Sequence, residues 1–210
     1  MTFEDVLQEL PLIAILRGLT PAEAAPVARA LFACGFRCLE VPLNSPEPFA
    51  SIRAIVDTVG DTALVGAGTV LHPDDVQRVK DAGGQIVISP NCNIEVIRAT
   101  KALGLVSLPA FFTPTEAFAA IDAGADGLKL FPAEVAGPQG LKAMRAVLPK
   151  AMPVFPVGGV DAETMAAYCD AGAAGFGIGS SLYAPGRSAE DTGARGRALV
   201  TAFRAARATG

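Results

Sequence analysis

Histidine is scarce in this sequence of 210 residues, which contains only His72. A histidine-ligated metal site needs several histidines, and a Ser-His-Asp triad needs one at its centre. The composition therefore argues against a metal held by histidines, and against such a triad unless His72 itself serves. Because His72 directly precedes Pro73 at an expected helix start, we interpret it as a surface or capping residue.

Cysteine is also sparse, and no two cysteines stand in a Cys-x-x-Cys pair. Buried free thiols are the usual state of isolated cysteines, so we expect that state here. The cysteine pattern therefore gives no indication of a metal site. The four cysteines are Cys34, Cys38, Cys92 and Cys169.

Positive charge is in deficit, with 17 Lys and Arg residues against 21 Asp and Glu residues and a net charge of −4. No Lys/Arg-rich run is present, which argues against a nucleic-acid partner. No run of 18 apolar residues is present either, which argues against a membrane span. The acidic start, Met1–Asp5, differs from the basic start of a signal peptide, so we expect a cytoplasmic protein.

Apolar residues are abundant: 51% of the chain is hydrophobic and only 18% is charged. The mean hydropathy of +0.41 is high for a soluble monomer. Either both faces of a sheet are buried, or a subunit interface covers apolar surface, or both.

Short apolar segments alternate with helical segments along the whole chain. Several expected helices open with Pro or Thr and end at Ala-Gly or Leu-Gly, which are ordinary helix start and stop signals. The expected strands are 12–16, 38–43, 64–70, 86–91, 105–109, 127–133, 154–159 and 175–181. The expected helices are 21–34, 48–59, one opened by Pro73, 94–103, one capped at Thr113 or Thr115, 140–148, one capped at Asp161, and 189–206.

Strict alternation of strand and helix implies parallel strands joined by right-handed crossovers. Eight such units predict a compact (β/α)8 TIM barrel, and because no linker is visible we expect one domain over residues 1–210. The alternative is an open doubly wound sheet. The first strand is followed by no G-x-G-x-x-G motif, which weakens that alternative.

A lysine, Lys129, lies in the middle of an apolar strand that we expect to be buried on both faces. Burial removes the hydration of an ammonium group and lowers its pKa, and a neutral amine attacks carbonyl carbon. Lys129 is therefore a candidate nucleophile. The plainer interpretation is a lysine near a strand end whose amine reaches water.

Active sites of barrels lie at the carboxyl ends of the strands, where this sequence places Arg17, Glu40 and Thr69. Glu40 is either an acid/base beside the Lys129 amine or that amine's partner in a structural ion pair. Arg17 either binds a substrate carboxylate through its guanidinium group or is a surface charge. Thr69 follows small residues that let a ligand approach the backbone, which is weak evidence alone.

Glycine-rich turns follow the expected seventh and eighth strands, at Gly158-Gly159 and Gly179-Ser180. In barrels these two loops commonly form a phosphate site, where backbone N–H groups bind the anion. Glycine can also simply ease a tight turn. Because both loops carry glycine in adjacent units, we favour a phosphate site.

Taken together, five segments resemble the class I 2-keto-3-deoxy-6-phosphogluconate/galactonate aldolase family over nearly the whole chain. The segments are Pro11-Leu12-Ile13-Ala14-Ile15-Leu16-Arg17-Gly18, Leu39-Glu40-Val41-Pro42-Leu43-Asn44-Ser45-Pro46, Gly66-Ala67-Gly68-Thr69-Val70, Lys129-Leu130-Phe131-Pro132 and Phe155-Pro156-Val157-Gly158-Gly159-Val160.

The resemblance implies a role for each candidate residue. Lys129 would form the Schiff base and Glu40 would shuttle protons. The substrate contacts it implies are Arg17 and Thr69 for the pyruvate carboxylate, and Gly158, Gly159, Gly179 and Ser180 for the phosphate. It also implies that no cofactor is used and that the protein is a homotrimer.

The expected reaction is cleavage of 2-dehydro-3-deoxy-6-phospho-D-galactonate to pyruvate and D-glyceraldehyde 3-phosphate. Asn44 and Val157 depart from the gluconate-specific members, which resemble Arg and Thr at these positions. Both departures resemble the galactonate branch. Activity on the gluconate epimer or on 4-hydroxy-2-oxoglutarate remains open, as do a phosphosugar epimerase or isomerase and a phosphosugar-binding barrel without turnover.

Overall fold

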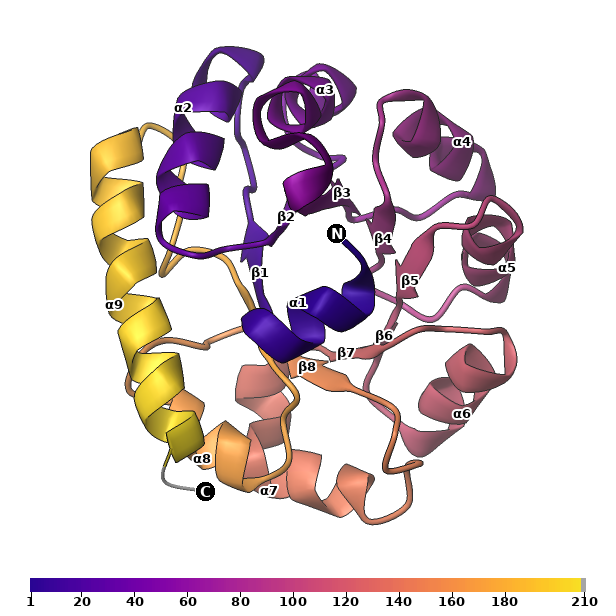
Figure 1. The fold of residues 1–210 in the computed structure, drawn as a ribbon. Coiled ribbons are helices and arrows are strands. Elements are labelled where there is room, and N and C mark those ends of the chain that lie inside the picture. Colours follow the sequence, from indigo (N-terminus) through magenta and orange to yellow (C-terminus); the bar gives the residue numbers. More distant parts are fainter. Residues whose placement is uncertain (209–210) are drawn as a thin grey trace.

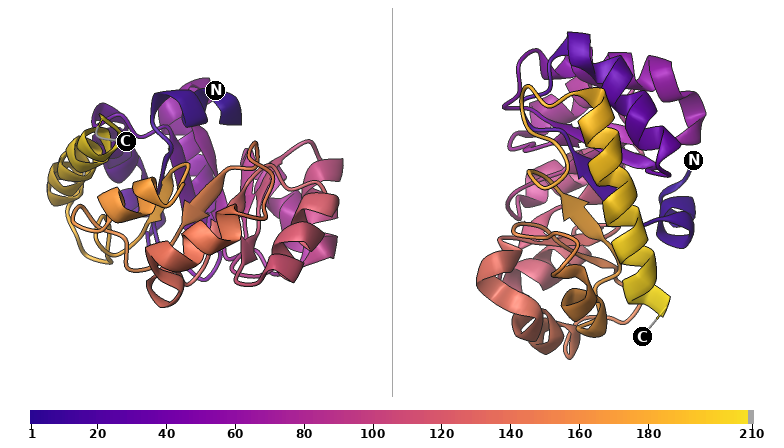
Figure 2. Two further views of the ribbon diagram at one scale, coloured as in Figure 1. Left: turned by 90° about the horizontal axis from the view of Figure 1, so that it is seen from below. Right: turned by 90° about the vertical axis from the view of Figure 1, so that its left-hand side faces the viewer.

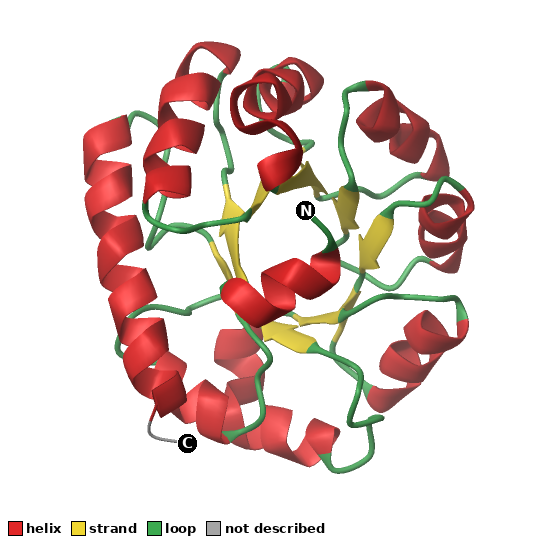
Figure 3. Ribbon diagram, in the orientation of Figure 1, coloured by secondary structure: helices red, strands yellow, loops and turns green. Residues whose placement is uncertain are grey.

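The computed structural model describes residues 1–208, whose strands surround a central axis while helices cover the outside (Figures 1 and 3). The strands are β1 (Leu12–Ile15), β2 (Cys38–Pro42), β3 (Leu64–Gly68), β4 (Ile86–Ile88), β5 (Val106–Leu108), β6 (Ala110–Phe111), β7 (Leu128–Leu130), β8 (Val154–Pro156) and β9 (Phe176–Ile178). The helices are α1 (Phe3–Glu9), α2 (Pro21–Ala33), α3 (Pro48–Val59), α4 (Pro73–Asp81), α5 (Ile94–Ala102), α6 (Pro114–Asp122), α7 (Ala133–Arg145), α8 (Met165–Asp170) and α9 (Ala189–Ala208), with a 3-10 turn over Gly60–Thr62.

All strand pairs are parallel, as the alternation predicted. One section of the sheet has the order β5-β4-β3-β2-β1-β9 and the other the order β6-β7-β8. The chain passes from β5 to β6 across Pro109, and a bridge between Val157 and Gly177 joins the other two ends. The fold is therefore α/β with a strongly curled parallel sheet.

Local signals position the helices where the sequence predicts them. Pro occupies the first turn of α2, α3, α4 and α6. Of the two expected caps of α6, Thr113 is the one used, in a capping box with Glu116. Among the glycines that follow helices, Gly83 and Gly124 have φ values of 85° and 98°, a backbone region that strongly favours glycine.

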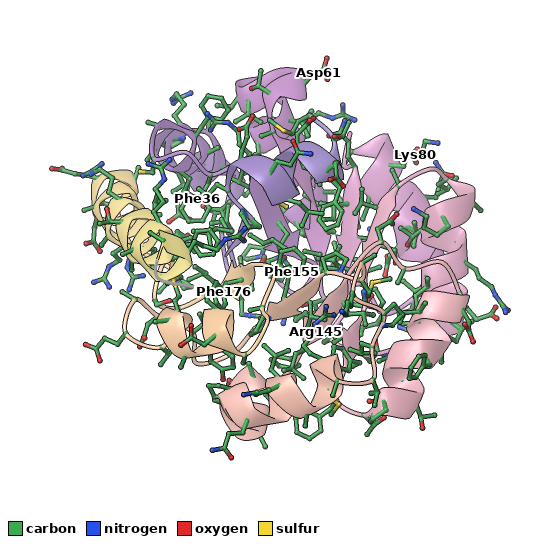
Figure 4. The ribbon with its side chains drawn as sticks, turned by 60° about the horizontal axis from the view of Figure 1, so that its bottom comes forward. Phe36, Asp61, Lys80, Arg145, Phe155 and Phe176 are labelled. Atoms are coloured by element: carbon green, nitrogen blue, oxygen red, sulfur yellow. The ribbon has the colours of Figure 1, made fainter. Side chains whose placement is uncertain are left out.

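Both faces of the sheet are buried, which explains the uninterrupted apolar strands. Along β1, Ile13 faces the interior cluster whereas Leu12 and Ala14 face the helices. Figure 4 shows Phe155 toward the middle of the molecule and Phe176 nearer α9, where its ring meets Phe203 edge to face at 6.0 Å. Two apolar layers on one curled sheet account for the high mean hydropathy.

Helix α1 was not predicted, and it crosses one end of the ring of strands (Figures 1 and 2). Its start is fixed by a capping box between Thr2 and Asp5. Phe3 reaches Phe155 inside the ring, at 6.0 Å between ring centroids, and Val6 is fully buried in the same interior cluster. Because Phe3 also lies beside Gly127, just before β7, the helix covers the amino ends of the strands.

Three local predictions need correction. Helix α7 begins at Ala133 rather than near Gly140, and non-helical angles at Gly137 kink it, so the sequence signal marked only its second half. Helix α8 begins at Met165; the Asp161 side chain accepts the N–H of Thr164 in a turn before the helix. Of the four cysteines, only Cys38 is fully buried.

None of the helices described for residues 1–208 is long and apolar enough to cross a membrane.

Candidate active site

Lys129 occupies the centre of β7, between Ala110 of β6 and Phe155 of β8 in the ladder. Only 6% of the residue is exposed, so most of the side chain is buried in the sheet. Its Nζ lies 4.9 Å from the centroid of the Phe131 ring. Burial lowers the pKa of the Lys129 amine; the Glu40 carboxylate opposes that shift and Arg17 adds to it.

Glu40 occupies the centre of β2 and is 1% exposed. Its Oε2 accepts no hydrogen bond from the residues described. Burial raises the pKa of the Glu40 carboxyl to about 7, while nearby Lys129 and Arg17 limit the rise. A Cβ atom at Gly68 would overlap this carboxylate, so glycine on β3 provides the space that Glu40 occupies.

A structural ion pair between these two groups is not found. Within residues 1–208, no contact of 4.0 Å or less joins the Glu40 carboxylate to the Lys129 amine. The two buried groups therefore influence each other's pKa without forming a direct ion pair. This arrangement is typical of catalytic acid/base groups rather than of a structural salt bridge.

Two adjoining cavities connect this pair to the surface at the carboxyl ends of the strands. Glu40 and Lys129 line a small inner cavity of about 10 Å³. A larger cavity of about 590 Å³ lies next to it and shares Ile15, Val157 and Gly177 with its lining. The larger cavity is also lined by Arg17, Phe131, Gly158, Gly159, Gly179 and Ser180.

Arg17 follows β1 and is exposed on the wall of the larger cavity. Its Nη1 donates a hydrogen bond of 2.7 Å to Oδ1 of Asn44, and the N–H of Gly18 donates to Oγ of Ser45 at 2.9 Å. The loop after β2 therefore holds the end of β1. A guanidinium fixed at a cavity wall is suited to binding a carboxylate.

The two glycine-rich turns meet at the same cavity. Gly158 and Gly159 have φ values of 105° and 66°, and a Cβ atom at Gly158 would overlap the Glu134 carboxylate. Among the described residues, the N–H groups of Gly159 and Ser180 donate to no protein group. Exposed N–H groups that converge on a cavity form an anion-binding arrangement without a basic side chain.

Thr69 follows β3 and lines neither cavity, although it lies at the same end of the sheet. It is half-buried and its φ is +55°, an unusual backbone conformation for a β-branched residue. Strained backbone of this kind tends to occur at functional positions. His72 lies on the surface at the start of α4, as predicted, and makes no side-chain cap bond.

Four residues at the site had been given no catalytic or binding role from the sequence, although Asn44 had been noted as a departure from the gluconate-specific members. Phe131 directly follows the lysine strand, Asn44 stands four residues after Glu40, and Ser181 extends the second glycine-rich turn. Tyr183 donates its hydroxyl to Glu23 over 3.4 Å, and burial with that carboxylate nearby raises the pKa of Tyr183 to about 12. Position after a strand end was a signal for Phe131 and Ser181, whereas nothing local marked Tyr183.

Comparison with known proteins gives the family of this chain. Residues 3–193 match the family described as KDPG and KHG aldolase. The chain belongs to the KDPG and KHG aldolase family. It is therefore an aldolase, a carbon–carbon lyase, and family membership decides against the epimerase and against the binding protein without turnover.

Individual members of the family are similar over nearly their whole length. The chain is 50% identical to the 2-dehydro-3-deoxy-6-phosphogalactonate aldolase of Escherichia coli over 94% of this chain and 97% of that protein. A solved structure described as native KDPGal superposes with a TM-score of 0.94 at 49% identity, covering 96% of this chain and 98% of that one.

A more distant solved structure contains a covalent pyruvate adduct. The KDPG aldolase of Legionella pneumophila, 27% identical with a TM-score of 0.83, covers 95% of this chain and 98% of its own. It was solved with pyruvate captured as a covalent carbinolamine intermediate. A carbinolamine on a protein is the adduct of an amine and a carbonyl carbon, so that relative uses an amine nucleophile.

Proposed function

We propose that this aldolase cleaves 2-dehydro-3-deoxy-6-phospho-D-galactonate to pyruvate and D-glyceraldehyde 3-phosphate through a Schiff base on Lys129. The observation that carries the proposal is a buried amine, with a lowered pKa and no ion-pair partner within 4.0 Å among the described residues, at the inner end of a cavity. The names of the similar proteins supply the substrate.

Lys129 and Glu40 divide the chemistry between them. The neutral amine attacks the C2 ketone and gives a carbinolamine, which loses water to form an iminium ion. The iminium accepts the electrons of the C3–C4 bond as that bond breaks, so an enamine forms. Glu40, directly or through a water, takes the proton of the C4 hydroxyl and later returns a proton to the enamine. A carboxyl with a pKa of about 7 is suited to both steps. Water then hydrolyses the resulting iminium, which breaks the bond between C2 and Nζ and releases pyruvate and the free amine of Lys129.

Arg17 and the two glycine-rich turns offer separate contacts on the wall of the larger cavity for the two anionic ends of the substrate. Arg17, held by Asn44, would bind the pyruvate carboxylate together with Thr69. Gly158, Gly159, Gly179 and Ser180 would bind the phosphate through backbone N–H groups. This route requires no metal or cofactor, because the imine serves as the electron sink.

Architecture and assembly complete the proposal. We infer that the bridge between β8 and β9 and the passage from β5 to β6 close the curled sheet into one (β/α)8 barrel domain. A cytoplasmic homotrimer remains our prediction. Exposed apolar side chains such as Phe112 and Val135 provide surface that subunit contacts would cover, and light scattering gives the mass that tests it.

Two assays test the reaction. Sodium borohydride added with pyruvate should reduce the imine and leave a stable adduct on the peptide containing Lys129, which mass spectrometry locates. Pyruvate release from the galactonate and gluconate epimers, assayed side by side, should be faster for the galactonate epimer. If the protein releases pyruvate but borohydride leaves no adduct on it, the Schiff-base route is excluded. If the protein prefers the gluconate epimer, the assignment of the galactonate epimer as substrate is wrong.

A further inference from the structure

A side-chain hydrogen bond joins the two loops that line the larger cavity. Oγ of Ser181, in the loop after β9, donates to the carbonyl oxygen of Val160, in the loop after β8, over 2.9 Å. Ser181 is half-buried and Val160 is 5% exposed, so water competes weakly for this bond. Both residues belong to the cavity lining.

Each loop is also anchored separately. The peptide that carries the Val160 carbonyl has its N–H, that of Asp161, bonded to Oγ1 of Thr164 at 3.0 Å. In the other loop, Nη1 of Arg187 donates to the Ser180 carbonyl at 3.0 Å. Because the C=O and N–H of a trans peptide point in opposite directions, that bond also directs the N–H of Ser181. The Ser181 hydroxyl thus links two loops that are each already oriented.

The distance between these loops matters for an anion that both must contact. Both loops contribute N–H groups that have no protein partner within residues 1–208, at Gly159 and Ser180. A phosphate accepts from both only if the loops stay at one separation, since hydrogen bonds weaken steeply with distance and angle.

We propose that Ser181 is a positioning residue that sets the separation of the two loops and thereby the affinity for the phosphate of the substrate. The inference rests on the proposed function, in which these loops bind that phosphate. Ser181 acts through the loops, so its loss should change phosphate binding while the bond-breaking chemistry at Lys129 continues.

The test compares Ser181→Ala, which removes the hydroxyl, with Ser181→Thr, which keeps it. The matched control is Thr58→Val, because the Thr58 hydroxyl is also half-buried and donates to a backbone carbonyl, that of Ala54 at 2.7 Å on α3. Calorimetry with inorganic phosphate gives the Kd, and steady-state assays give kcat and KM for the phosphorylated sugar acid and for the same acid without phosphate.

Ser181→Ala should weaken phosphate binding and raise KM for the phosphorylated acid, each roughly three- to tenfold, the effect of one hydrogen bond. Its kcat, and its KM for the unphosphorylated acid, should match the unmodified protein. Ser181→Thr and Thr58→Val should leave the phosphate Kd unchanged.

Two outcomes overturn the inference: an unchanged phosphate Kd in Ser181→Ala, or an equal loss on both sugar acids, which would mark a structural role alone. The proposed function fails differently. If the unmodified protein forms no trapped imine and releases no pyruvate, while Ser181→Ala still weakens phosphate binding, the reaction is wrong and the role of Ser181 stands.

Discussion

The two ends of the ring of strands are built from different chemistry. At the amino end, α1 covers the strands with Phe3 and Val6, and the interior beneath it is apolar. At the carboxyl end, the buried side chains include a carboxylate and an amine, and glycine-rich turns leave N–H groups exposed. The amino end is filled by apolar side chains that pack against one another. The carboxyl end instead has polar groups that no described protein group hydrogen-bonds and that a substrate can contact.

Residues that stabilise the fold and residues that form the site therefore lie at opposite ends of the ring of strands. Burial of apolar surface at the amino end stabilises the fold. At the carboxyl end, the unpaired Oε2 of Glu40 and the left-handed backbone of Thr69 each cost stability, which the rest of the fold has to offset. Substitutions at the amino end should therefore lower stability more than activity, and substitutions at the carboxyl end should lower activity more than stability.

The largest effect should come from Lys129→Ala, which removes the nucleophile. We expect turnover and borohydride trapping of pyruvate both to be abolished, with the fold intact. Lys101→Ala is the control, because Lys101 pairs with Asp126 at the amino end of β7, with 2.6 Å between Nζ and Oδ2. It should keep full trapping. Reduced pyruvate found on another lysine would show that the nucleophile is assigned wrongly.

Glu40→Gln should come next, because it keeps the shape of the side chain and removes its acid/base function. We expect kcat/KM to fall by about 10²–10⁴-fold, the usual contribution of a general acid/base. Trapping of pyruvate should persist, since Lys129 still forms the imine. Activity within a few-fold of the unmodified protein would remove Glu40 from the mechanism.

The same variant tests the pKa of Glu40 through stability. Because the folded-state pKa is raised from 4.5 to about 7, the folded protein holds an extra proton between these values. The stabilisation from that proton is present below about pH 4.5 and is lost as pH rises through about 7. Urea unfolding at about pH 5 and about pH 8 should show Glu40→Gln gaining stability relative to the unmodified protein as pH rises. A constant difference would contradict the raised pKa.

Arg17→Ala should weaken binding at the carboxyl end without affecting the amino end. The loss of a charged hydrogen bond costs about 1.5–3 kcal/mol, which is roughly 10–150-fold in pyruvate affinity. Inhibition by pyruvate measures this effect. Arg78→Ala, at a surface arginine paired with Asp75, is the control and should bind pyruvate normally. If pyruvate inhibits the Arg17 variant and the unmodified protein equally, the pyruvate carboxylate binds elsewhere.

Phe3→Ala tests the amino end in the opposite sense. Removal of this half-buried ring from Phe155 should lower the free energy of unfolding by about 2 kcal/mol, below the ~3–5 kcal/mol of a fully buried Phe. Chemical denaturation measures the loss, and kcat/KM should change less than about twofold. If activity falls while stability holds, the two ends are coupled and the comparison fails.

The smallest effect should come from Val157→Thr at the junction of the two cavities. Val157 is 7% exposed and lines both cavities. A Thr hydroxyl there could hydrogen-bond one C4 epimer, so kcat/KM for the gluconate epimer should rise about tenfold with little change for the galactonate epimer. An unchanged ratio of the two kcat/KM values would redirect the search to Asn44.

Much of the fold could be predicted from the sequence because the signals that start and end its helices are local. Proline and threonine at helix starts, and glycine after helix ends, act within one turn, so α2 to α6 were found close to their observed bounds. Helix α1 was missed because seven residues carry little periodicity, and the first half of α7 was missed because Gly137 and Pro138 look like a break.

The sequence by itself determined that strands and helices alternate and that Lys129 and Glu40 lie in apolar strands, since both facts depend on neighbours in the chain. Only the tertiary structure decided that Lys129 and Glu40 remain unpaired at the inner cavity, that Asn44 holds Arg17, and that Ser181 reaches Val160. Each of these three features involves residues far apart in the chain. The distances between such residues follow from the curvature of the sheet, which no local pattern encodes.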